Sequence, residues 1–221
     1  MSQPVPPLRA LSARFNEALA GAANLHAQQR RKGTDTPFVA HLLGVAAIAL
    51  EFGATEDEAI AALLHDAIED APPELGPDWV RRWIRHRFGD AVLAVVEGCT
   101  DTDEHPKPSW RVRKERYVAR LAEKPEGTIL VSAADKLHNA RAILADFRTS
   151  GDAVFSRFNR DAGKAGTIGY YRGLVEAYEA RLQQPESPRT GRIRTLIREL
   201  DVAVSTLEQE AGLRGVWPLR I

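Results

Sequence analysis

Three things are scarce in this chain: cysteine, an excess of charge of either sign, and long apolar runs. Cys99 is the single cysteine among 221 residues, so the chain cannot form an internal disulfide, which favours a reducing compartment. The opening residues, Met-Ser-Gln-Pro-Val-Pro-Pro-Leu, lack the charged segment and apolar core of a signal peptide. The longest apolar stretches, 39–50 and 59–64, are too short or too interrupted to span a bilayer. We therefore expect a cytoplasmic protein with no membrane partner.

The charge balance narrows the class of partner further. Lysine plus arginine number 30 and aspartate plus glutamate number 30, so the formal net charge is zero. A broad nucleic-acid surface normally needs a basic excess, and we expect no nucleic-acid polymer as a partner. A local basic pocket for a small phosphorylated ligand remains compatible with this balance.

Apolar residues recur at helical spacing along almost the whole chain, and alternating strand patterns are scarce. This pattern predicts an all-α fold, a helical bundle. Thr55 and Glu58 fit a capping box that opens a helix running through the apolar segment 59–71 and ending before Pro72. A glycine at position 53 suits the end of the helix before it. The other predicted helices cover about residues 8–29, 40–52, 78–87, 90–100, 109–123, 127–148, 160–183 and 189–210.

The length allows one domain or two small ones, and the chain shows no repeat or low-complexity tract. Residues 183–188 are predicted to form a short linker or turn. We interpret residues 1–221 as one domain, with a core at about 10–182 and an amphipathic C-terminal helix at about 189–210. That helix packs on the core or is offered to a partner chain, which leaves a homo-oligomer open. Its apolar positions are Ile193, Leu196, Ile197, Leu200, Val204 and Leu207.

Four side chains of metal-binding types follow one another in the order His41, His65, Asp66 and Asp135. The middle pair lies within residues 59–71, an apolar helix that carries four titratable side chains within six positions. Burying such groups is costly unless each finds a partner, and a divalent cation suits histidine and carboxylate together. Neighbours on a helix lie about 100° apart, so the pair reaches one ion only if adjacent helices supply the other ligands. Two imidazoles and two carboxylates leave coordination positions open, as in catalytic sites.

A structural interpretation competes with the metal site. His65 and Asp66 could pair with each other or with the backbone in a polar core network, and Asp135 could be a solvated helix residue. A lone His-Asp dipeptide occurs by chance, whereas the ordered set of four is much more specific. The spacing therefore favours the metal site.

Five segments carry a resemblance to a known family: Arg31-Lys32, Thr36-Pro37-Phe38-Val39-Ala40-His41, Leu63-Leu64-His65-Asp66-Ala67-Ile68-Glu69-Asp70, Cys99-Thr100-Asp101 and Ala134-Asp135-Lys136-Leu137-His138-Asn139. With them the chain resembles the HD-superfamily hydrolase domain of RelA/SpoT-type proteins, and more closely the small stand-alone alarmone hydrolases, over about residues 10–182. The resemblance implies an HD-domain bundle, a manganese ion, and removal of the 3′-pyrophosphate from guanosine tetra- or pentaphosphate to give GDP or GTP. It also implies the metal ligands His41, His65, Asp66 and Asp135. Their types alone would equally permit iron, zinc or cobalt.

Glu69 and Asp70 match the acidic pair of the family's catalytic motif. On a continuous helix each would lie one turn beyond a metal ligand, where it could orient a water and accept its proton. The sequence does not say which of the two accepts it. As a structural alternative, both would be exposed acids at a helix C-terminus, an arrangement that the helix dipole disfavours.

The resemblance also assigns substrate contacts. Arg31 and Lys32 match the basic pair that holds substrate phosphates, and Asn139 matches an asparagine near both substrate and metal. Asn139 shares a helix face with Asp135, four residues earlier. Tyr171, together with Tyr170, is expected to line the nucleotide pocket, although helical aromatic residues more often belong to the core. Lys136 and Arg141 are further candidates for neutralising pyrophosphate oxygens.

Two departures leave the nucleotide preference open: Phe38 replaces the family's usual tyrosine, and Leu42 stands where many members have proline. A second hypothesis is therefore a phosphohydrolase acting on another nucleotide, such as an adenosine alarmone or a 2′- or 3′-phosphorylated dinucleotide cofactor. A third is a nucleotide sensor without turnover. The intact pair of Glu69 and Asp70 argues against the third, because a pure binder needs no base to activate water.

Overall fold

Helices make up the regular structure of this chain, as the apolar spacing predicted. The computed structural model describes residues 10–214 apart from 103, 105, 159–161 and 184–188. Among these residues, a single isolated antiparallel bridge between Arg30 and Pro37 is the only β-type pairing. None of the helices described is long and apolar enough to cross a membrane. The α-helices are α1 (Ala13–Leu25), α2 (Val39–Glu51), α3 (Glu56–Leu64), α4 (Gly76–Phe88), α5 (Asp90–Cys99), α6 (Trp110–Ala119), α7 (Glu126–Ser150), α8 (Gly163–Arg181) and α9 (Thr190–Glu210), with 3-10 turns η1 (Arg120–Glu123) and η2 (Gly151–Arg157).

Local capping explains several helix boundaries. The hydroxyl of Thr55 accepts from the amide of Glu58, and the carboxylate of Glu58 accepts from the amide of Thr55, which confirms the predicted capping box. Gly53 follows α2 with a φ of 91°, a left-handed conformation that suits glycine after a helix end. Ser12 caps α1, and the predicted start of that helix at Leu8 lies outside the described residues.

Two helices end earlier than the sequence predicted. Helix α1 ends at Leu25 rather than near Gln29, because the chain turns there and Gln29 accepts a backbone hydrogen bond from Phe38. Helix α3 ends at Leu64, not just before Pro72, so residues 65–70 form turns. The His-Asp pair therefore lies immediately after a helix and not inside one. The predicted linker at 183–188 lies, except for residue 183, outside the described residues.

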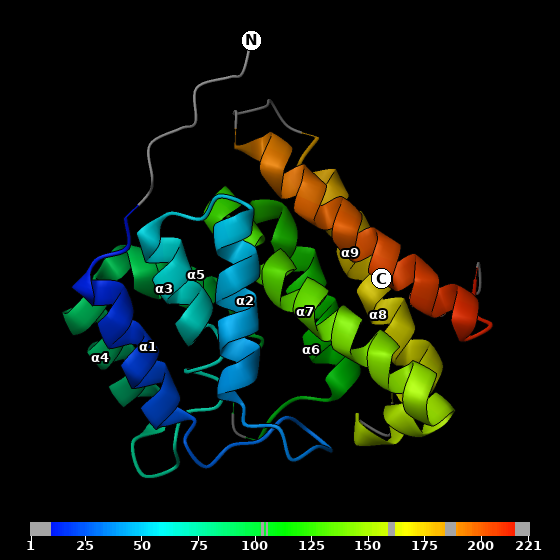
Figure 1. Cartoon of the computed structure of the whole chain (residues 1–221), viewed down its shortest axis with the longest axis horizontal. Coiled ribbons are helices and arrows are strands. Elements are labelled where there is room, and N and C mark those ends of the chain that lie inside the picture. Colours follow the sequence, from blue (N-terminus) through cyan, green and yellow to red (C-terminus); the bar gives the residue numbers. More distant parts are fainter. Residues whose placement is uncertain (1–9, 103, 105, 159–161, 184–188, 215–221) are drawn as a thin grey trace.

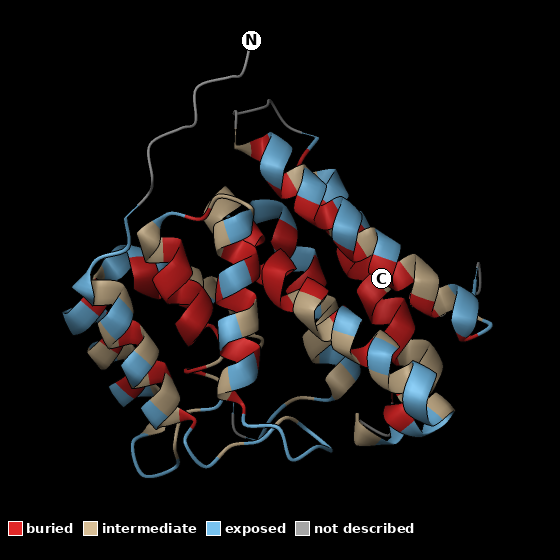
Figure 2. Ribbon diagram, in the orientation of Figure 1, coloured by how far each residue is buried: buried red, intermediate tan, exposed pale blue. Residues whose placement is uncertain are grey.

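Helices α2, α3 and α7 pack against one another and form the centre of the bundle (Figure 1). Their inward faces are buried, and so are the facing sides of the helices around them (Figure 2). Helix α1 packs on α3, α5 packs on α3 and α7, and α4 packs on α5. The arrangement brings three chain segments that are far apart in sequence to one point in the interior.

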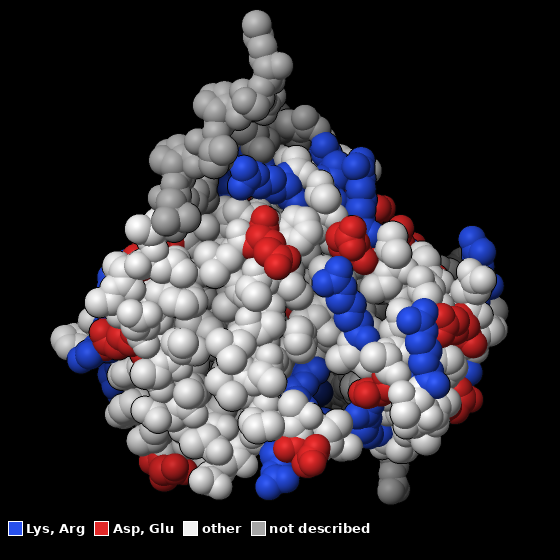
Figure 3. Space-filling view, viewed as in Figure 1, with Lys and Arg blue, Asp and Glu red and all other residues white. Residues whose placement is uncertain are grey.

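Helix α9 lies along α7 and α8 and buries the apolar face that its sequence predicted. The six apolar positions named above are all buried on this helix. Lysine, arginine and acidic side chains gather on the face over α7 and α9, whereas the face over α1 and α2 is mostly uncharged (Figure 3). Within the described residues, the apolar face of α9 is therefore part of the core.

Candidate metal centre and reaction cavity

Four side chains converge where α2, the end of α3 and α7 meet. His41 stands on the first turn of α2, His65 caps the end of α3, Asp66 follows it, and Asp135 lies in the middle of α7. We call these four residues the His-Asp cluster. Nε2 of His41 lies 3.2 Å from Nε2 of His65, and the two imidazoles are 1% and 2% exposed. The fold therefore brings all four candidate ligands together at one site.

The spacing of the ligand atoms fits a single divalent ion. Oδ2 of Asp66 lies 3.1 Å from His65 Nε2 and 3.6 Å from His41 Nε2. Oδ1 of Asp135 lies 3.2 Å from His41 Nε2 and 3.6 Å from His65 Nε2. Ligands about 2.1 Å from one ion are about 3.0–3.4 Å apart in octahedral or tetrahedral arrangements, so these separations suit shared coordination. His41, His65 and Asp66 also have ligand atoms that all lie within 4.8 Å of one another.

Hydrogen bonds on the far side of each imidazole fix its orientation. Nδ1 of His65 lies 2.8 Å from the carbonyl oxygen of Ala62, which can only accept, so Nδ1 carries the proton and Nε2 is free to bind a metal. Nδ1 of His41 lies 2.9 Å from Nδ1 of His138. The sequence alone leaves His138 either near the site or exposed, and the structure places it directly behind a candidate ligand.

Asp135 is held by polar neighbours on its own helix and beyond. Its Oδ2 accepts from Nζ of Lys136 at 2.5 Å, and its Oδ1 accepts from Nδ2 of Asn139 at 2.5 Å. Asn139 in turn accepts from the guanidinium of Arg31 at 2.7 Å. Burial opposes the charge on Asp135, but Lys136 holds its pKa well below the usual range. Without a metal, protons on the Nε2 atoms of His65 and His41 likewise lower the pKa of Asp66 against the effect of burial, and a bound cation would take the place of those protons. Both carboxylates are therefore ionised, as a metal site requires.

A cavity of about 210 Å³ opens in front of the His-Asp cluster. Its lining includes both acids of the Glu69–Asp70 pair, together with Arg31, Asn139 and Tyr170. Although α3 ends at Leu64, the amide of Asp70 still bonds the carbonyl of Asp66 at 2.9 Å, so a single helical turn separates these two residues. A single turn, and not a continuous helix, therefore places the acidic pair beside the candidate ligands. We call this space the reaction cavity.

The two acids of the pair have different partners. Glu69 accepts from Nζ of Lys107 at 3.2 Å. Asp70 accepts from the side-chain amide of Gln29 at 2.8 Å, and Oε1 of Gln29 lies 2.6 Å from Nδ1 of His26. Burial, reinforced by the charge of Asp66, raises the pKa of both Glu69 and Asp70. A raised pKa makes each carboxylate a better proton acceptor than a solvated one.

Basic groups also line the reaction cavity. Lys114 donates to Asp101 at 2.9 Å and its Nζ lies 5.0 Å from the ring centre of Tyr170. Asp101 also pairs with Arg113, so it supports the cavity from the loop. Burial lowers the pKa of Lys114. With Arg31 and Lys136, Lys114 places cationic groups in the same cavity as the Glu69–Asp70 pair.

A protein-family model described as "HD domain" matches residues 18–167 of this chain. The chain belongs to the HD domain family. The guanosine-3′,5′-bis(diphosphate) 3′-pyrophosphohydrolase MESH1 of Mus musculus is 38% identical over 133 residues, which are 59% of this chain and 69% of that protein. The Homo sapiens protein of the same name shows the same identity and coverage. A solved metazoan SpoT ortholog, described as hydrolysing ppGpp, matches with a TM-score of 0.66 at 24% identity over 93% of this chain and 99% of that chain, a likeness in fold.

The structure separates the expected substrate contacts of this HD domain into two groups. Arg31 and Asn139 line the reaction cavity, whereas Lys32 is exposed and is not among the residues that line it. Tyr170 lines the cavity, whereas its neighbour Tyr171 is buried without lining it. Arg141 pairs with Glu199 on the surface.

Sequence reasoning did not find Lys114 and Tyr117, which line the cavity. It also missed Gln29 and Lys107, which bond the acids Asp70 and Glu69. Gln29 lies directly before the basic segment, but nothing in its local sequence points to Asp70, 41 residues away. Lys107 and Lys114 follow the Cys-Thr-Asp segment at a spacing that matches no motif. Only the packing of α6 and the loop before it brings these lysines to the cavity.

Proposed function

We propose that this chain hydrolyses the 3′-pyrophosphate of guanosine 3′,5′-bis(diphosphate) to give GDP and pyrophosphate, and that it converts the pentaphosphate to GTP in the same way. The observation that carries the proposal is the reaction cavity, in which the His-Asp cluster, an acidic pair and several cations face one another. Curated relatives that are 38% identical carry the name of this activity.

The reaction adds water to the phosphorus next to the 3′-oxygen. The bond between that phosphorus and the 3′-oxygen breaks, pyrophosphate leaves with the oxygen of water, and the 3′-oxygen takes up a proton. A divalent ion held by His41, His65, Asp66 and Asp135 would polarise a phosphate oxygen and lower the pKa of water at this site. The chain's own residues must then orient the water, take its proton and hold the anionic substrate.

Glu69 and Asp70 are assigned the proton transfer. Both line the cavity beside Asp66, and burial raises the pKa of both. Their supports differ: Lys107 stabilises the charged form of Glu69, and Gln29 fixes the direction in which Asp70 points. Either acid could accept the proton of water, and separate substitutions distinguish them.

Arg31, Lys136 and Lys114 are assigned to the substrate's phosphate oxygens. Arg31 is tied to Asn139, and Lys136 to Asp135, so these charges stand at fixed positions before substrate arrives. Such preorganised cations stabilise charge that develops on a transferring phosphoryl group. Lys32 is exposed, and as a substrate contact it would require the loop between α1 and α2 to move.

We further propose manganese as the ion, since the mixed imidazole and carboxylate set admits it alongside iron, zinc and cobalt. A reducing compartment such as the cytoplasm is proposed from the free thiol of Cys99. Neither proposal affects the assignment of the acids and cations.

The test is release of pyrophosphate by the purified chain with guanosine tetraphosphate and added manganese. The substrate panel should include the pentaphosphate, the adenosine analogue and a 2′- or 3′-phosphorylated dinucleotide cofactor, each with manganese, iron, zinc and cobalt. We expect guanosine tetraphosphate and pentaphosphate to give the highest kcat/KM. Metal bound by elemental analysis together with no turnover of either guanosine substrate would refute the proposed function.

A further inference from the structure

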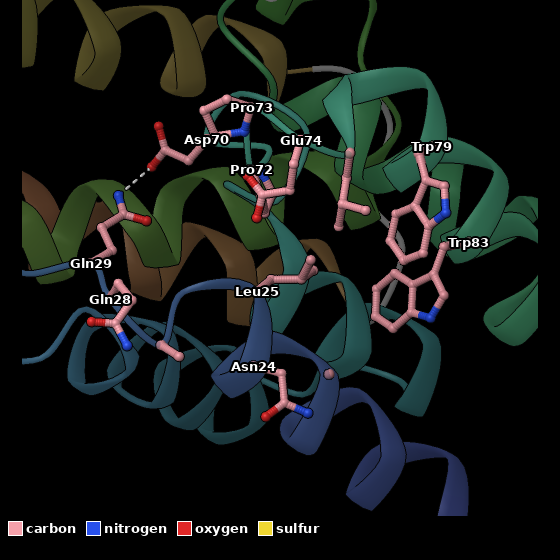
Figure 4. Close-up of a pocket in the computed structure, with 13 residues that line it drawn as sticks. Asn24, Leu25, Gln28, Gln29, Asp70, Pro72, Pro73, Glu74, Trp79 and Trp83 are labelled. Carbon is pink, nitrogen blue, oxygen red and sulfur yellow. Dashed lines mark hydrogen bonds between the residues drawn. The ribbon is translucent and has the colours of Figure 1, made fainter.

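A second hollow lies beside the reaction cavity, on the other side of Asp70. Its volume is about 750 Å³, within the range of about 300–1,000 Å³ found for small-molecule sites. It runs between the end of α1, the segment 70–75 and α4, with Trp79 and Trp83 along one side and Leu25 facing them (Figure 4). We call this hollow the Trp79 groove. Asp70 lines both the groove and the reaction cavity.

Neighbouring residues hold the rings of Trp79 and Trp83 in a fixed arrangement on one side of the groove. The rings of Trp79 and Trp83 are 6° from parallel with centres 6.2 Å apart, and Phe88 meets Trp83 edge-on at 5.4 Å. Trp83 lies against α1 at Gly21, where a Cβ atom would come within 2.7 Å of the ring. Trp79 stands at the open edge and is 37% exposed. Two flat aromatic faces are therefore held in place beside solvent, where a ligand can reach them.

The charge of the groove is negative. Among the thirteen described residues that line it, Asp70 and Glu74 are the charged groups, with no lysine or arginine. This sign disfavours a phosphorylated nucleotide, so the groove is not an extension of the site that holds the anionic substrate. Carboxylates combined with tryptophan faces suit the opposite charge, because the face of an indole ring attracts cations.

We propose that the Trp79 groove binds a small organic cation with a flat apolar body, an aryl-alkyl amine in chemical class. Its ring would lie against Trp79, and its ammonium group would point towards the carboxylate of Glu74, with Asp70 adding negative charge from the far end of the groove (Figure 4). The amides of Asn24, Gln28 and Gln29, which also line the groove, provide further polar contacts.

Calorimetric titration of the full chain tests the binding. The probes are 2-phenylethylamine, 2-phenylethanol and 3-phenylpropionate, which share a ring and a short chain and differ in charge. We expect the amine to bind at least about tenfold more tightly than the alcohol, and the carboxylate to bind most weakly. Trp79→Ala and Glu74→Gln should each weaken binding of the amine about tenfold. Glu179 is an exposed acid on α8, and Glu179→Gln should leave the affinity for the amine unchanged.

Trp79→Phe serves as a second variant that keeps an aromatic face and should retain most of the affinity. Equal binding of amine and alcohol, or unchanged affinity in both Trp79→Ala and Glu74→Gln, would overturn the proposal. Absence of binding by the amine to the wild-type chain would overturn it too.

Hydrolysis assays with and without the amine test whether the groove is separate from the substrate site. We expect kcat and KM for guanosine tetraphosphate to be unchanged by the amine. A raised KM would place the amine in the reaction cavity and overturn the assignment. Because calorimetry requires no turnover, failure of the proposed function would leave the binding result standing.

Discussion

Nδ1 of His138 lies 2.9 Å from Nδ1 of His41, on the side of that ring away from the His-Asp cluster. One of the two nitrogens must donate and the other accept. Metal binding by Nε2 of His41 requires a lone pair there, which puts the proton on its Nδ1 and makes His138 the acceptor. Burial, with His41 and Arg31 nearby, lowers the pKa of His138 to about 4, so its ring is neutral and can accept. His138 therefore sets the tautomer of a candidate ligand.

Replacing His138 by phenylalanine should weaken manganese binding about 10- to 100-fold, because the proton on Nδ1 of His41 loses its acceptor. His138→Gln keeps an acceptor oxygen and should lose less affinity for manganese. Affinity is measured by competition with a chelator, and far-ultraviolet circular dichroism confirms the fold. His86, exposed on α4, supplies the control His86→Phe, which should bind as the wild type does. Equal affinities in His138→Phe and wild type would refute the role.

Gly44 on α2 makes room for the ring of His138. A Cβ atom at this position would lie 2.3 Å from Cδ2 of that ring, far inside van der Waals contact. Gly44→Ala should therefore push His138 away from His41 and reduce metal affinity about tenfold or more, although alanine favours a helix. Gly191→Ala on α9 is the matched control, since nothing lies within 4 Å of its Cβ position. It should leave metal binding unchanged and raise the midpoint of unfolding slightly.

The fold and the meeting of the His-Asp cluster could be predicted because their signals are local. Helical spacing and the Thr55 capping box need only a few neighbouring residues, and the ordered ligand types recur as a motif. The end of α3 at Leu64 could not be predicted, since the apolar spacing continues to Pro72 without a breaker. At that end, Nδ1 of His65 bonds the carbonyl of Ala62 while its Nε2 faces His41 on α2, a contact between residues 24 positions apart.

Two further features could not be predicted, because they depend on the orientation of a helix and on a contact between residues far apart in the sequence. Tyr170 and Tyr171 are neighbours on one helix, about 100° apart, and only the orientation of α8 decides which of them faces the cavity. The contact of Gln29 with Asp70 joins residues 41 positions apart, a pairing that no periodicity encodes. The interpretation of residues 1–221 as one domain remains a prediction.

Replacing the acids one at a time should separate their roles. We expect Glu69→Gln and Asp70→Asn to retain the metal, and the acid that accepts the proton to show the larger loss of kcat, about 10²- to 10⁴-fold. Gln29→Met removes the hydrogen bond to Asp70 but keeps the carboxylate, so it should lower kcat less than Asp70→Asn does. Steady-state hydrolysis with metal content checked for each variant gives the answer, with Glu51→Gln, an exposed acid at the end of α2, as control. If both acid variants keep wild-type kcat, the assignment of proton transfer is wrong.

Lys124 gives the protein a distinctive dependence of stability on pH. Its side chain is buried, with Nζ 3.8 Å from the ring centre of Tyr117 and no hydrogen-bond partner within the described structure. Burial lowers its pKa to about 8 from an ordinary value of 10.5. The unfolded chain therefore holds this proton more tightly, and its contribution to the free energy of unfolding rises between about pH 8 and 10.5.

Lys124→Met removes both the buried charge and that rise. The variant should be about 2 kcal/mol more stable than wild type at pH 7, and the difference should shrink towards pH 10.5. Urea unfolding at pH 7, 8, 9 and 10 measures it. Lys164→Met, which breaks a surface pair with Asp152, should change stability by less than about 1 kcal/mol. A difference between Lys124→Met and wild type that does not vary with pH would contradict the argument.

Asn139 links a substrate-binding group to a metal ligand, since it accepts from Arg31 and donates to Asp135. In Asn139→Ala, Asp135 keeps its bond to Lys136, so the variant should retain metal. Arg31 loses its fixed position, and KM should rise about tenfold, as expected for loss of a charge-assisted hydrogen bond. Asp135→Ala should instead lose metal and activity together. Elemental analysis beside steady-state kinetics distinguishes the two, and loss of metal from Asn139→Ala would show that the asparagine supports Asp135 rather than the substrate.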